Sequence, residues 1–357
     1  MDIREKRKWQ HIKHALQVPI GPISTGFNDI YLVHQAVSCL DSAEINTSKI
    51  FLGKRLDFPL LINALTGGAA GLGEINQKLS LAAKECDIAL AVGSQTAALN
   101  NPDTLKTFSI VRKINRDGLI FANVSALVDY KYALQAVEMI EADGLQLHLN
   151  LAQELAMPEG DRDFSGLLEN IAFIKEKSPV PVIIKEVGFG ISLETLEKLI
   201  NIGIKFIDIG GAGGTNFAAI ERARNKSFTN PNLVEWGIPT VISLIETLSV
   251  AKEISVCASG GIYSASSILK SLALGADLVG IALPVLEKAY HNDVNDIIKY
   301  INNLKTQVKE LMLLTGAREI CDLKTIPIIV TGFVKEWLEA RGIDISHYAK
   351  RSLQQPI

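Results

Sequence analysis

The stretch VPVIIKEVGFGISLETLEKLINIGIKFIDIGGAGG, residues 180–214, contains one strand–helix–strand unit. Its two ends, 180–188 and 206–214, are β-rich apolar runs that finish in glycine. Between them, residues 192–203 place apolar side chains at i, i+3 and i+4, which is the spacing of one helix face. Strands that alternate with helices in this way run parallel in one sheet, so the unit predicts an α/β fold.

The same rhythm recurs along the chain. Eight apolar runs are separated by amphipathic patterns, at 60–68, 88–95, 119–126, 145–150, 180–188, 206–214, 254–261 and 277–284. Eight such units in about 225 residues suit a (β/α)₈ TIM barrel. An open, doubly wound sheet is the alternative, but its glycine fingerprint is concentrated at the first βα turn, whereas here glycines follow many strands. We therefore predict the barrel.

The regions outside these runs suggest the domain organisation. Residues 1–59 are expected to form an N-terminal extension with a basic segment, and residues 60–357 a single barrel domain. Within that domain, 285–357 would supply the eighth helix and a C-terminal helical tail. The connection at 212–235 is longer than the others, and long βα connections usually have a function or form a lid.

Composition narrows the class of protein. Of 357 residues, 48% are hydrophobic and 21% charged, which predicts a large core, and the net charge of −3 gives no reason to expect nucleic acid. The most apolar long stretch, 271–286, contains Asp277 and Gly275 and reads as a helix end, a turn and a strand, so no membrane span is predicted. The chain opens MDIREKRKWQ, without an apolar signal region. Four widely spaced cysteines indicate a reducing compartment, and a soluble cytoplasmic protein is expected: Cys39, Cys86, Cys257 and Cys321.

Residues 148–154, HLNLAQE, place polar side chains at the end of the fourth predicted strand. Side chains alternate along a strand, so Gln146, His148 and Asn150 share one face, and the intervening leucines share the other. Barrel active sites lie at the carboxyl ends of the strands. The polar face is therefore expected to line the interior and reach the site; the alternative is a hydrogen-bonded polar layer of the core.

The other strand ends bring small or hydrogen-bonding residues. These are Asn63, Ala64, Leu65 and Thr66; Ser94, Gln95 and Thr96; Asn123 and Ser125; Lys185 and Glu186; and Thr215. Such ends suit a flat ligand that is hydrogen-bonded along its edge, although glycines after strands also simply turn the chain.

Strands seven and eight have a more specific pattern. Residues 258–262, ASGGI, lead into a helix opened by Ser264. Residues 280–286, GIALPVL, come later in the chain, at the end of the last predicted strand. In barrels the loops after strands seven and eight commonly bind phosphate with backbone N–H groups and a helix N-terminus. Tight packing alone is the alternative explanation of the glycines.

Two sets of cations are candidates for anion binding. Lys185 ends the fifth strand and could pair with phosphate, stabilise a reduced flavin, form a Schiff base or face solvent. The flat, non-covalent ligand suggested by the glycine-rich ends disfavours the Schiff base. In RKWQHIKH, residues 7–14, a helix would bring Arg7, Lys8 and His11 together, either as a solvated basic face or as a diphosphate clamp.

Taken together, these motifs resemble type 2 isopentenyl-diphosphate isomerase in order from residue 7 to about residue 351: RKWQH, NALTGG, VGSQ, HLNLAQE, IIKEVG, GGAGGTNFAAIE, ASGGI and TGFVKEWLEARGID. Singly, ASGGI or GGAGGT is shared with several flavin barrels, but the ordered set is specific. The resemblance implies an isomerase that requires FMN and Mg²⁺ and interconverts isopentenyl and dimethylallyl diphosphates. It also implies that NAD(P)H reduces the FMN, that the reaction has no net redox change, and that the protein is a homotetramer.

The resemblance also implies roles for individual residues. Flavin contacts would be Ala64, Leu65, Thr66, Ser94, Asn123, Lys185 and Thr215, with Gly260, Gly261, Ile262, Ala282 and Leu283 on the phosphate side. Substrate contacts would be Arg7, Lys8, His11, Ser94, Gln95, Thr96, His148, Asn150 and Gln153. Glu154 would bind Mg²⁺, and Gln153 and Lys185 would be catalytic. Two positions differ from the family pattern, because Leu65 stands where many members have methionine and Thr96 stands where some have a basic residue.

The chemistry of such a substrate explains the unusual composition of HLNLAQE. Moving an unactivated double bond requires one proton to be added and another to be removed two carbons away. The motif offers a single carboxylate, Glu154, which Mg²⁺ would occupy together with the diphosphate oxygens. We therefore hypothesise that reduced FMN, held by Lys185, is the acid–base group and that Gln153 positions or relays the proton.

Three rival functions make different demands on the sequence. A 2-hydroxy-acid oxidase would need His and Arg near the end of strand seven, where ASGGIYSAS has neither. A barrel resembling inosine-monophosphate dehydrogenase would need a cysteine after strand six, but Cys257 lies inside strand seven. A non-catalytic flavin- or phosphate-binding barrel would lack the clamp and metal carboxylate that Arg7, Lys8 and Glu154 are expected to provide.

Overall fold

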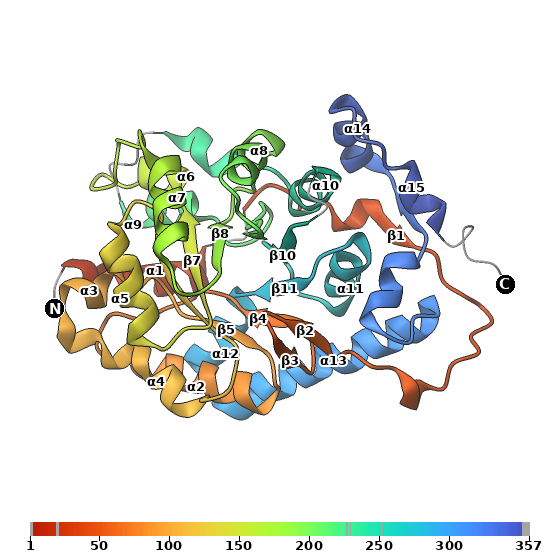
Figure 1. Cartoon of the computed structure of the whole chain (residues 1–357), viewed down its shortest axis with the longest axis horizontal. Helices are drawn as coiled ribbons and strands as arrows, with labels where there is room; N and C mark the ends of the chain where they lie inside the picture. Colours follow the sequence, from red (N-terminus) through yellow and green to blue (C-terminus); the bar gives the residue numbers. More distant parts are fainter. Residues whose placement is uncertain (1–2, 19–20, 226–227, 229, 251–252, 352–357) are drawn as a thin grey trace.

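The computed structural model describes residues 3–18, 21–225, 228, 230–250 and 253–351, and it confirms the predicted barrel (Figure 1). Eight strands form a closed barrel in which every neighbouring pair is parallel. They are β4 (Leu60–Ile62), β5 (Ala89–Ala91), β6 (Ile120–Ser125), β7 (Gly144–Leu149), β8 (Val182–Glu186), β9 (Phe206–Asp208), β10 (Ser255–Ser259) and β11 (Leu278–Ile281). Each lies within one of the predicted apolar runs or overlaps it.

Helices follow each strand and cover the outside of the barrel. They are α2 (Leu72–Glu85), α3 (Thr96–Asn100), α4 (Lys106–Ile114), α5 (Tyr130–Met139), α6 (Leu151–Ala156), α7 (Leu167–Lys177), α8 (Leu193–Asn201), α9 (Phe217–Arg224), α10 (Thr240–Val250), α11 (Ala265–Leu274) and α12 (Leu283–His291). The helix predicted at 192–203 is α8. The long connection at 212–235 contains α9 and a 3₁₀ turn, Pro231–Glu235.

The register of the strands places their inward-facing polar residues side by side. Asn123 on β6 pairs with Gln146 on β7, and His148 on β7 pairs with Lys185 on β8. Lys185 in turn pairs with Asp208 on β9. Leu145 and Leu147 point the other way and are fully buried against the surrounding helices. The alternation predicted for the fourth barrel strand is therefore confirmed.

A hairpin closes the amino-terminal end of the barrel. It consists of β2 (Lys49–Phe51) and β3 (Lys54–Leu56), joined by Leu52 and Gly53 with φ of 47° and 76°. Two positive φ values are typical of the tight hairpin turn that matches strand twist. Phe51 and Leu56 pack inside the barrel against apolar residues at the strand beginnings. A ligand therefore has access to the interior at the opposite, carboxyl end.

The N-terminal extension and the C-terminal tail meet on the outside of the barrel. In the extension, α1 (Ile3–Gln17) packs against α9, and β1 (Ile30–Leu32) pairs antiparallel with β12 (Ile328–Val330). The described part of the tail also contains three α-helices, α13 (Val294–Thr315), α14 (Gly332–Ala340) and α15 (Ser346–Ala349). The helical tail predicted from sequence thus also contains a strand, because an antiparallel partner from residues 30–32 lies beside it.

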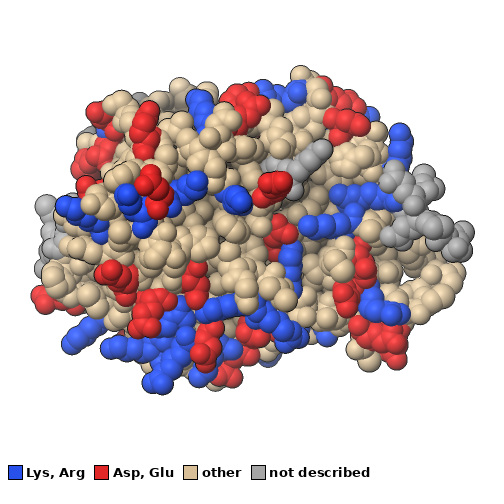
Figure 2. Space-filling view, in the orientation of Figure 1, with Lys and Arg blue, Asp and Glu red and all other residues tan. Residues whose placement is uncertain are grey.

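The surface agrees with the small net charge. On the face drawn in Figure 2, acidic and basic side chains are interspersed. Within the described ranges, no helix has the length and apolar character needed to cross a bilayer.

Candidate active site

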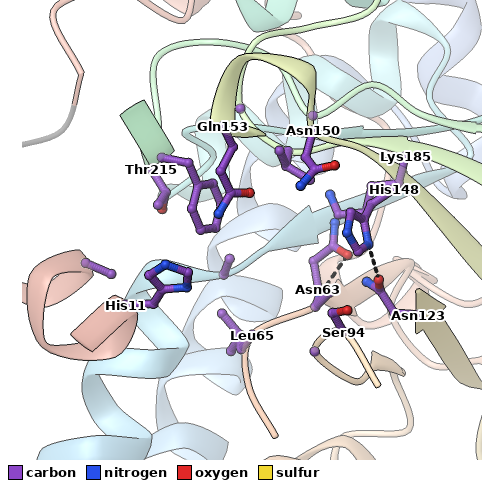
Figure 3. Close-up of a pocket in the computed structure, with 18 of the residues that line it drawn as sticks. His11, Asn63, Leu65, Ser94, Asn123, His148, Asn150, Gln153, Lys185 and Thr215 are labelled. Carbon is purple, nitrogen blue, oxygen red and sulfur yellow. Dashed lines mark hydrogen bonds between the residues drawn. The ribbon is translucent and has the colours of Figure 1, made fainter. Parts of the chain in front are cut away.

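A cavity of about 750 Å³ opens at the carboxyl ends of the barrel strands. Its volume lies within the range of small-molecule and cofactor sites. The predicted site residues that line it are Arg7, Lys8, His11, Ala64, Leu65, Thr66, Ser94, Thr96, Asn123, His148, Asn150, Gln153, Glu154, Lys185, Thr215, Gly260, Gly261, Ile262, Ala282 and Leu283. Figure 3 shows the labelled side chains of β-strand ends, α1 and α6 converging on one space.

Gln95 is the exception, and its prediction as a substrate contact is wrong. The side chain is fully buried below the cavity. Its amide nitrogen donates to the carbonyl of Ala136 at 2.9 Å, and its amide oxygen accepts from the N–H of Asn123 at 2.9 Å. Gln95 therefore joins β6 to α5 and leaves no group for a ligand.

Two hydroxyls in the cavity wall have no partner among the described residues. They are Oγ1 of Thr66 and the phenol oxygen of Tyr263, and both are shielded from solvent. Burial raises the pKa of Tyr263 to about 12, so its hydroxyl keeps its proton. A buried hydroxyl without a hydrogen bond is costly, which makes both groups strong candidates for contacts with a bound ligand.

The loops after β10 and β11 present unpaired backbone donors to the same cavity. Within the described chain, the N–H groups of Gly261, Ile262 and Leu283 have no acceptor. The loop after β10 leads into α11, which Ser264 caps, and α12 begins at Leu283. Free N–H groups near helix N-termini bind anions well.

The glycines of these loops are also required by packing. A Cβ on Gly260 would lie 2.1 Å from the carbonyl oxygen of Gly211, and one on Gly214 would lie 2.3 Å from the nitrogen of Gly261. The loops after β9 and β10 therefore meet backbone to backbone. The packing explanation of ASGGI is thus confirmed, and it is compatible with the predicted anion binding, because the tight packing brings the free N–H groups to the cavity.

The basic segment of α1 forms another part of the wall. Nζ of Lys8 donates to the carbonyl of Ser94 at 3.2 Å, beside the hydroxyl pair of Ser94 and Thr96, which are 3.1 Å apart. Burial, with help from the charge of Arg7, lowers the pKa of Lys8 to about 8. Lys8 thus supplies a cation where the sequence has Thr96 in place of a basic residue.

His11 is held by a carboxylate that was not predicted. Its Nε2 lies 2.7 Å from Oε1 of Glu221, a fully buried residue of α9 whose Oε2 accepts from Arg224 at 2.6 Å. Burial lowers the pKa of His11 despite this neighbour. The neutral ring therefore donates Nε2–H to Glu221 and leaves Nδ1 as an acceptor. Arg7 lies 3.8 Å from Glu159 at the edge of the cavity.

His148 is neutral and its tautomer follows from its partners. Nδ2 of Asn123 donates to Gln146, so its Oδ1 is the acceptor for Nδ1–H of His148, at 2.7 Å (Figure 3). Burial, together with Lys8 and Lys185, lowers the pKa of His148 to about 3. Its Nε2 therefore faces a ligand as a lone pair, and can donate to an anion only after it takes up a proton.

Glu154 belongs to α6, and the loop that follows this helix folds back over its side chain. Its carboxylate accepts from Nδ2 of Asn150 at 2.7 Å and from the N–H of Asp161 at 2.9 Å. Arg162 donates to the Glu154 carbonyl at 2.6 Å and ties the loop down. Among the described residues no three His, Cys, Asp or Glu side chains are close enough to hold a metal. A hard cation at Glu154 would therefore take most of its oxygen ligands from water and a bound anion.

Gln153 differs from the other amides of the cavity because its side chain has no hydrogen-bond partner in the described chain. Only 8% of the residue is exposed, and its carboxamide points into the cavity (Figure 3). Asn150, by contrast, is occupied by Glu154, and Asn123 by His148. Gln153 is thus free to contact a ligand at both its donor and its acceptor.

Sequence reasoning missed four residues that shape the site. Asp208 and Ser259 lie under Lys185, Glu221 holds His11, and Tyr263 lines the cavity. Period-two alternation in β9 could have found Asp208, because it faces inward between Phe206 and Gly210. Glu221 carried no such signal, since only the docking of α1 on α9 brings it to His11.

Comparisons with known proteins agree with this geometry. The model of the FMN-dependent dehydrogenase family matches residues 161–329. The chain is 43% identical over 350 residues to isopentenyl-diphosphate delta-isomerase of Bacillus pumilus, covering 98% of each chain. It is 44% identical over 349 residues to that of Geobacillus sp., covering 98% of this chain and 99% of the relative. With that of Symbiobacterium thermophilum the identity is 41% over 362 residues, covering 99% of each.

Solved structures with the same fold are much more distant in sequence. A mandelate oxidase mutant with the monooxide FMN adduct has a TM-score of 0.61 at 15% identity, covering 90% of this chain and 92% of that one. A flavocytochrome b2 variant with sulfite bound has a TM-score of 0.65 at 17% identity, covering 88% and 81%. At these identities the likeness shows the barrel fold alone.

Proposed function

The chain belongs to the isopentenyl-diphosphate delta-isomerase family, and from that premise we propose that it interconverts isopentenyl and dimethylallyl diphosphates with reduced FMN, Mg²⁺ and NAD(P)H as the reductant. The observation that supports this best is the composition of one cavity. It combines unpaired backbone donors at one end, a basic helix at another, and the free carboxamide of Gln153 beside the carboxylate of Glu154.

The residues of the cavity fit FMN. The unpaired Oγ1 of Thr66 and the small residues at the strand ends suit the edge of a planar ring, and Lys185 supplies a positive charge beside it. The free N–H groups of Gly261, Ile262 and Leu283 suit its phosphate. Reduced FMN, when bound, would supply exchangeable ring protons. In the proposed reaction these protons take the place of a paired side-chain acid and base.

Residues of α1 and the polar end of β7 would hold the diphosphate. Arg7 and Lys8 provide charge, and Asn150 carries an amide within reach of Glu154. His11 and His148 are neutral in the free protein and present lone pairs, so each would bind the anion with uptake of a proton. Glu154 would hold Mg²⁺, which would supply positive charge for the diphosphate, and Gln153 would lie beside the allylic carbons and orient the migrating proton.

The rival functions find less support in the cavity. Of the described residues at the end of β10, those lining the cavity are Ser259, Gly260, Gly261, Ile262 and Tyr263, without the His and Arg of a hydroxy-acid oxidase. Cys257 faces the lower barrel core, and burial raises the pKa of its thiol well above the usual value, which argues against a nucleophile. The homotetramer inferred from the family resemblance stays a prediction, which sedimentation equilibrium can test.

The test is anaerobic proton NMR in D₂O of isopentenyl diphosphate with protein, FMN, Mg²⁺ and NADPH. A matched sample omits only the reductant. Dimethylallyl diphosphate is expected to form only in the complete sample. Product at the same rate in both samples would refute the role of reduced FMN, and no product in either, despite bound FMN, would refute the isomerase.

Diphosphate affinity is expected to fall as the pH rises through about 8, the pKa of Lys8 in the free protein. A bound anion keeps the ammonium charged, so binding above this pH requires uptake of a proton and weakens by up to about tenfold per pH unit. Titration calorimetry with inorganic diphosphate from pH 6.5 to 9.5 measures this effect. Lys8→Met should bind more weakly and lose this inflection, and an inflection retained in the variant would assign it to another group.

FMN affinity is expected to fall about tenfold in Tyr263→Phe, since a hydrogen bond to a charged phosphate contributes about 1.5 kcal/mol. The variant removes only the unpaired hydroxyl, so packing of the loop is kept. Quenching of flavin fluorescence measures the dissociation constant. Tyr290→Phe, at an exposed tyrosine of α12, is the matched control and should bind as the parent does. Equal affinities of all three proteins would exclude Tyr263 from the phosphate site.

A further inference from the structure

Asp208 is a completely buried carboxylate directly beneath the cavity. Its Oδ2 lies 3.2 Å from Nζ of Lys185 and accepts from Nδ2 of Asn63 at 2.6 Å. Its Oδ1 accepts from the hydroxyl of Ser259. The ends of three strands, β8, β4 and β10, thus direct a cation, an amide and a hydroxyl at this one carboxylate of β9. Surroundings made only of donors are those of an ionised carboxylate.

The hydrogen bonds of Lys185 leave one direction free. Its ammonium has three N–H donors. One is directed at Asp208, and a second is donated to the carbonyl of Glu186 at 2.9 Å. Lys185 is only 8% exposed and lines the cavity, so the third donor is left for a ligand. The ammonium is therefore held by the Asp208 carboxylate and the Glu186 carbonyl.

The strand register explains how the pair arises. Lys185 and Asp208 are paired residues of β8 and β9, and side chains of paired residues point to the same side of a sheet. Lysine has four rotatable side-chain bonds, and without a partner its ammonium would sample many positions in a cavity of about 750 Å³. Asn63 and Ser259 restrain Asp208 in turn, so the carboxylate is a fixed anchor.

We propose that Asp208 is a positioning residue that fixes the Lys185 ammonium at the floor of the cavity, and that it acts on the reaction only through Lys185. This inference rests on the proposed function for the role of Lys185 in catalysis. The ion pair itself can be tested without any activity.

The first experiment is a double-mutant cycle on thermal unfolding of the protein without FMN. Lys185→Met leaves Asp208 as a buried charge without its cation, so its unfolding midpoint should fall by about 6–10 °C. Asp208→Asn keeps its amide oxygen as the acceptor for Asn63, and its new amide nitrogen can donate to the hydroxyl oxygen of Ser259, so its midpoint should fall by less. The double variant removes both charges and should recover at least half of the loss seen in Lys185→Met.

The second experiment repeats the cycle on FMN binding and on turnover. Asp208→Asn should lower kcat by about 10- to 100-fold, with KM for isopentenyl diphosphate changed less than about twofold, because a misplaced ammonium impairs the chemical step more than binding. In the Lys185→Met background the same substitution should change neither kcat nor the dissociation constant of FMN further. Glu246→Gln is the control, because Glu246 is also buried but bonds to Trp337 and Arg341, away from the cavity.

Three outcomes would overturn the proposal. If Asp208→Asn lowered kcat by the same factor in the parent protein and in Lys185→Met, Asp208 would have a merely structural role. The same conclusion would follow if Glu246→Gln lowered kcat as much as Asp208→Asn does. An unchanged unfolding midpoint in Lys185→Met would show that the pair does not hold, even if Asp208→Asn failed to fold. If the parent protein binds FMN but has no isomerase activity, the proposed function fails, and the unfolding and FMN cycles still decide on the pair.

Discussion

Gln153→Ala is expected to lower kcat for isomerisation by about 10²- to 10⁴-fold, the range that a positioned proton-transfer group contributes. Gln153 offers the free side-chain amide that the cavity directs at a ligand, while the neighbouring amides of Asn123 and Asn150 are engaged by His148 and Glu154. KM should change little, because the expected diphosphate contacts are unaltered. Initial rates with pre-reduced FMN under anaerobic conditions measure both constants.

The matched control for this change is Gln135→Ala, which removes the same side chain from an exposed position of α5. It should leave kcat unchanged. FMN absorbance of both variants shows whether the cofactor is retained, so that loss of chemistry is separated from loss of FMN. Full turnover by Gln153→Ala would remove this residue from the mechanism.

Glu154→Gln is expected to lower kcat/KM by at least about 10²-fold at a fixed Mg²⁺ concentration and to raise the Mg²⁺ concentration needed for half-maximal rate. Mg²⁺ binds through carboxylates and substrate phosphates, and a neutral amide loses the charge that attracts it. The new amide nitrogen would also face Asn150 or the N–H of Asp161, which donate to the carboxylate in the parent protein. Rates measured as a function of Mg²⁺ concentration test both effects.

Asp163→Asn provides the comparison. Asp163 is an exposed carboxylate in the loop between α6 and α7, and among the described residues it forms hydrogen bonds only with Ser165. It should preserve the Mg²⁺ dependence. If Glu154→Gln also preserved it, the metal would have to bind elsewhere, and the cavity carboxylates Glu159 and Asp161 would be examined next.

The barrel, and the end of it at which the site lies, could be predicted from local sequence patterns. Period-two and period-3.6 patterns are local, so eight strands and their helices could be recognised from short stretches such as 180–214. In a parallel barrel all the strand ends meet at one face, so residues after the strands had to converge there. Of the residues given a binding or catalytic role, every one except Gln95 lines the cavity there.

The hydrogen-bond and ion-pair partners of these residues, by contrast, depend on how distant segments pack. Gln95 follows a strand as Ser94 does, but α5 lies close enough for the buried Gln95 side chain to donate a hydrogen bond to the carbonyl of Ala136. Lys185 and Asp208 are 23 positions apart, and the register of β8 and β9 makes them a pair. His11 contacts Glu221 because α1 packs against α9. β1 pairs with β12, although most of the chain separates the two strands in sequence. Such contacts depend on the packing of distant segments, whose geometry no local periodicity encodes.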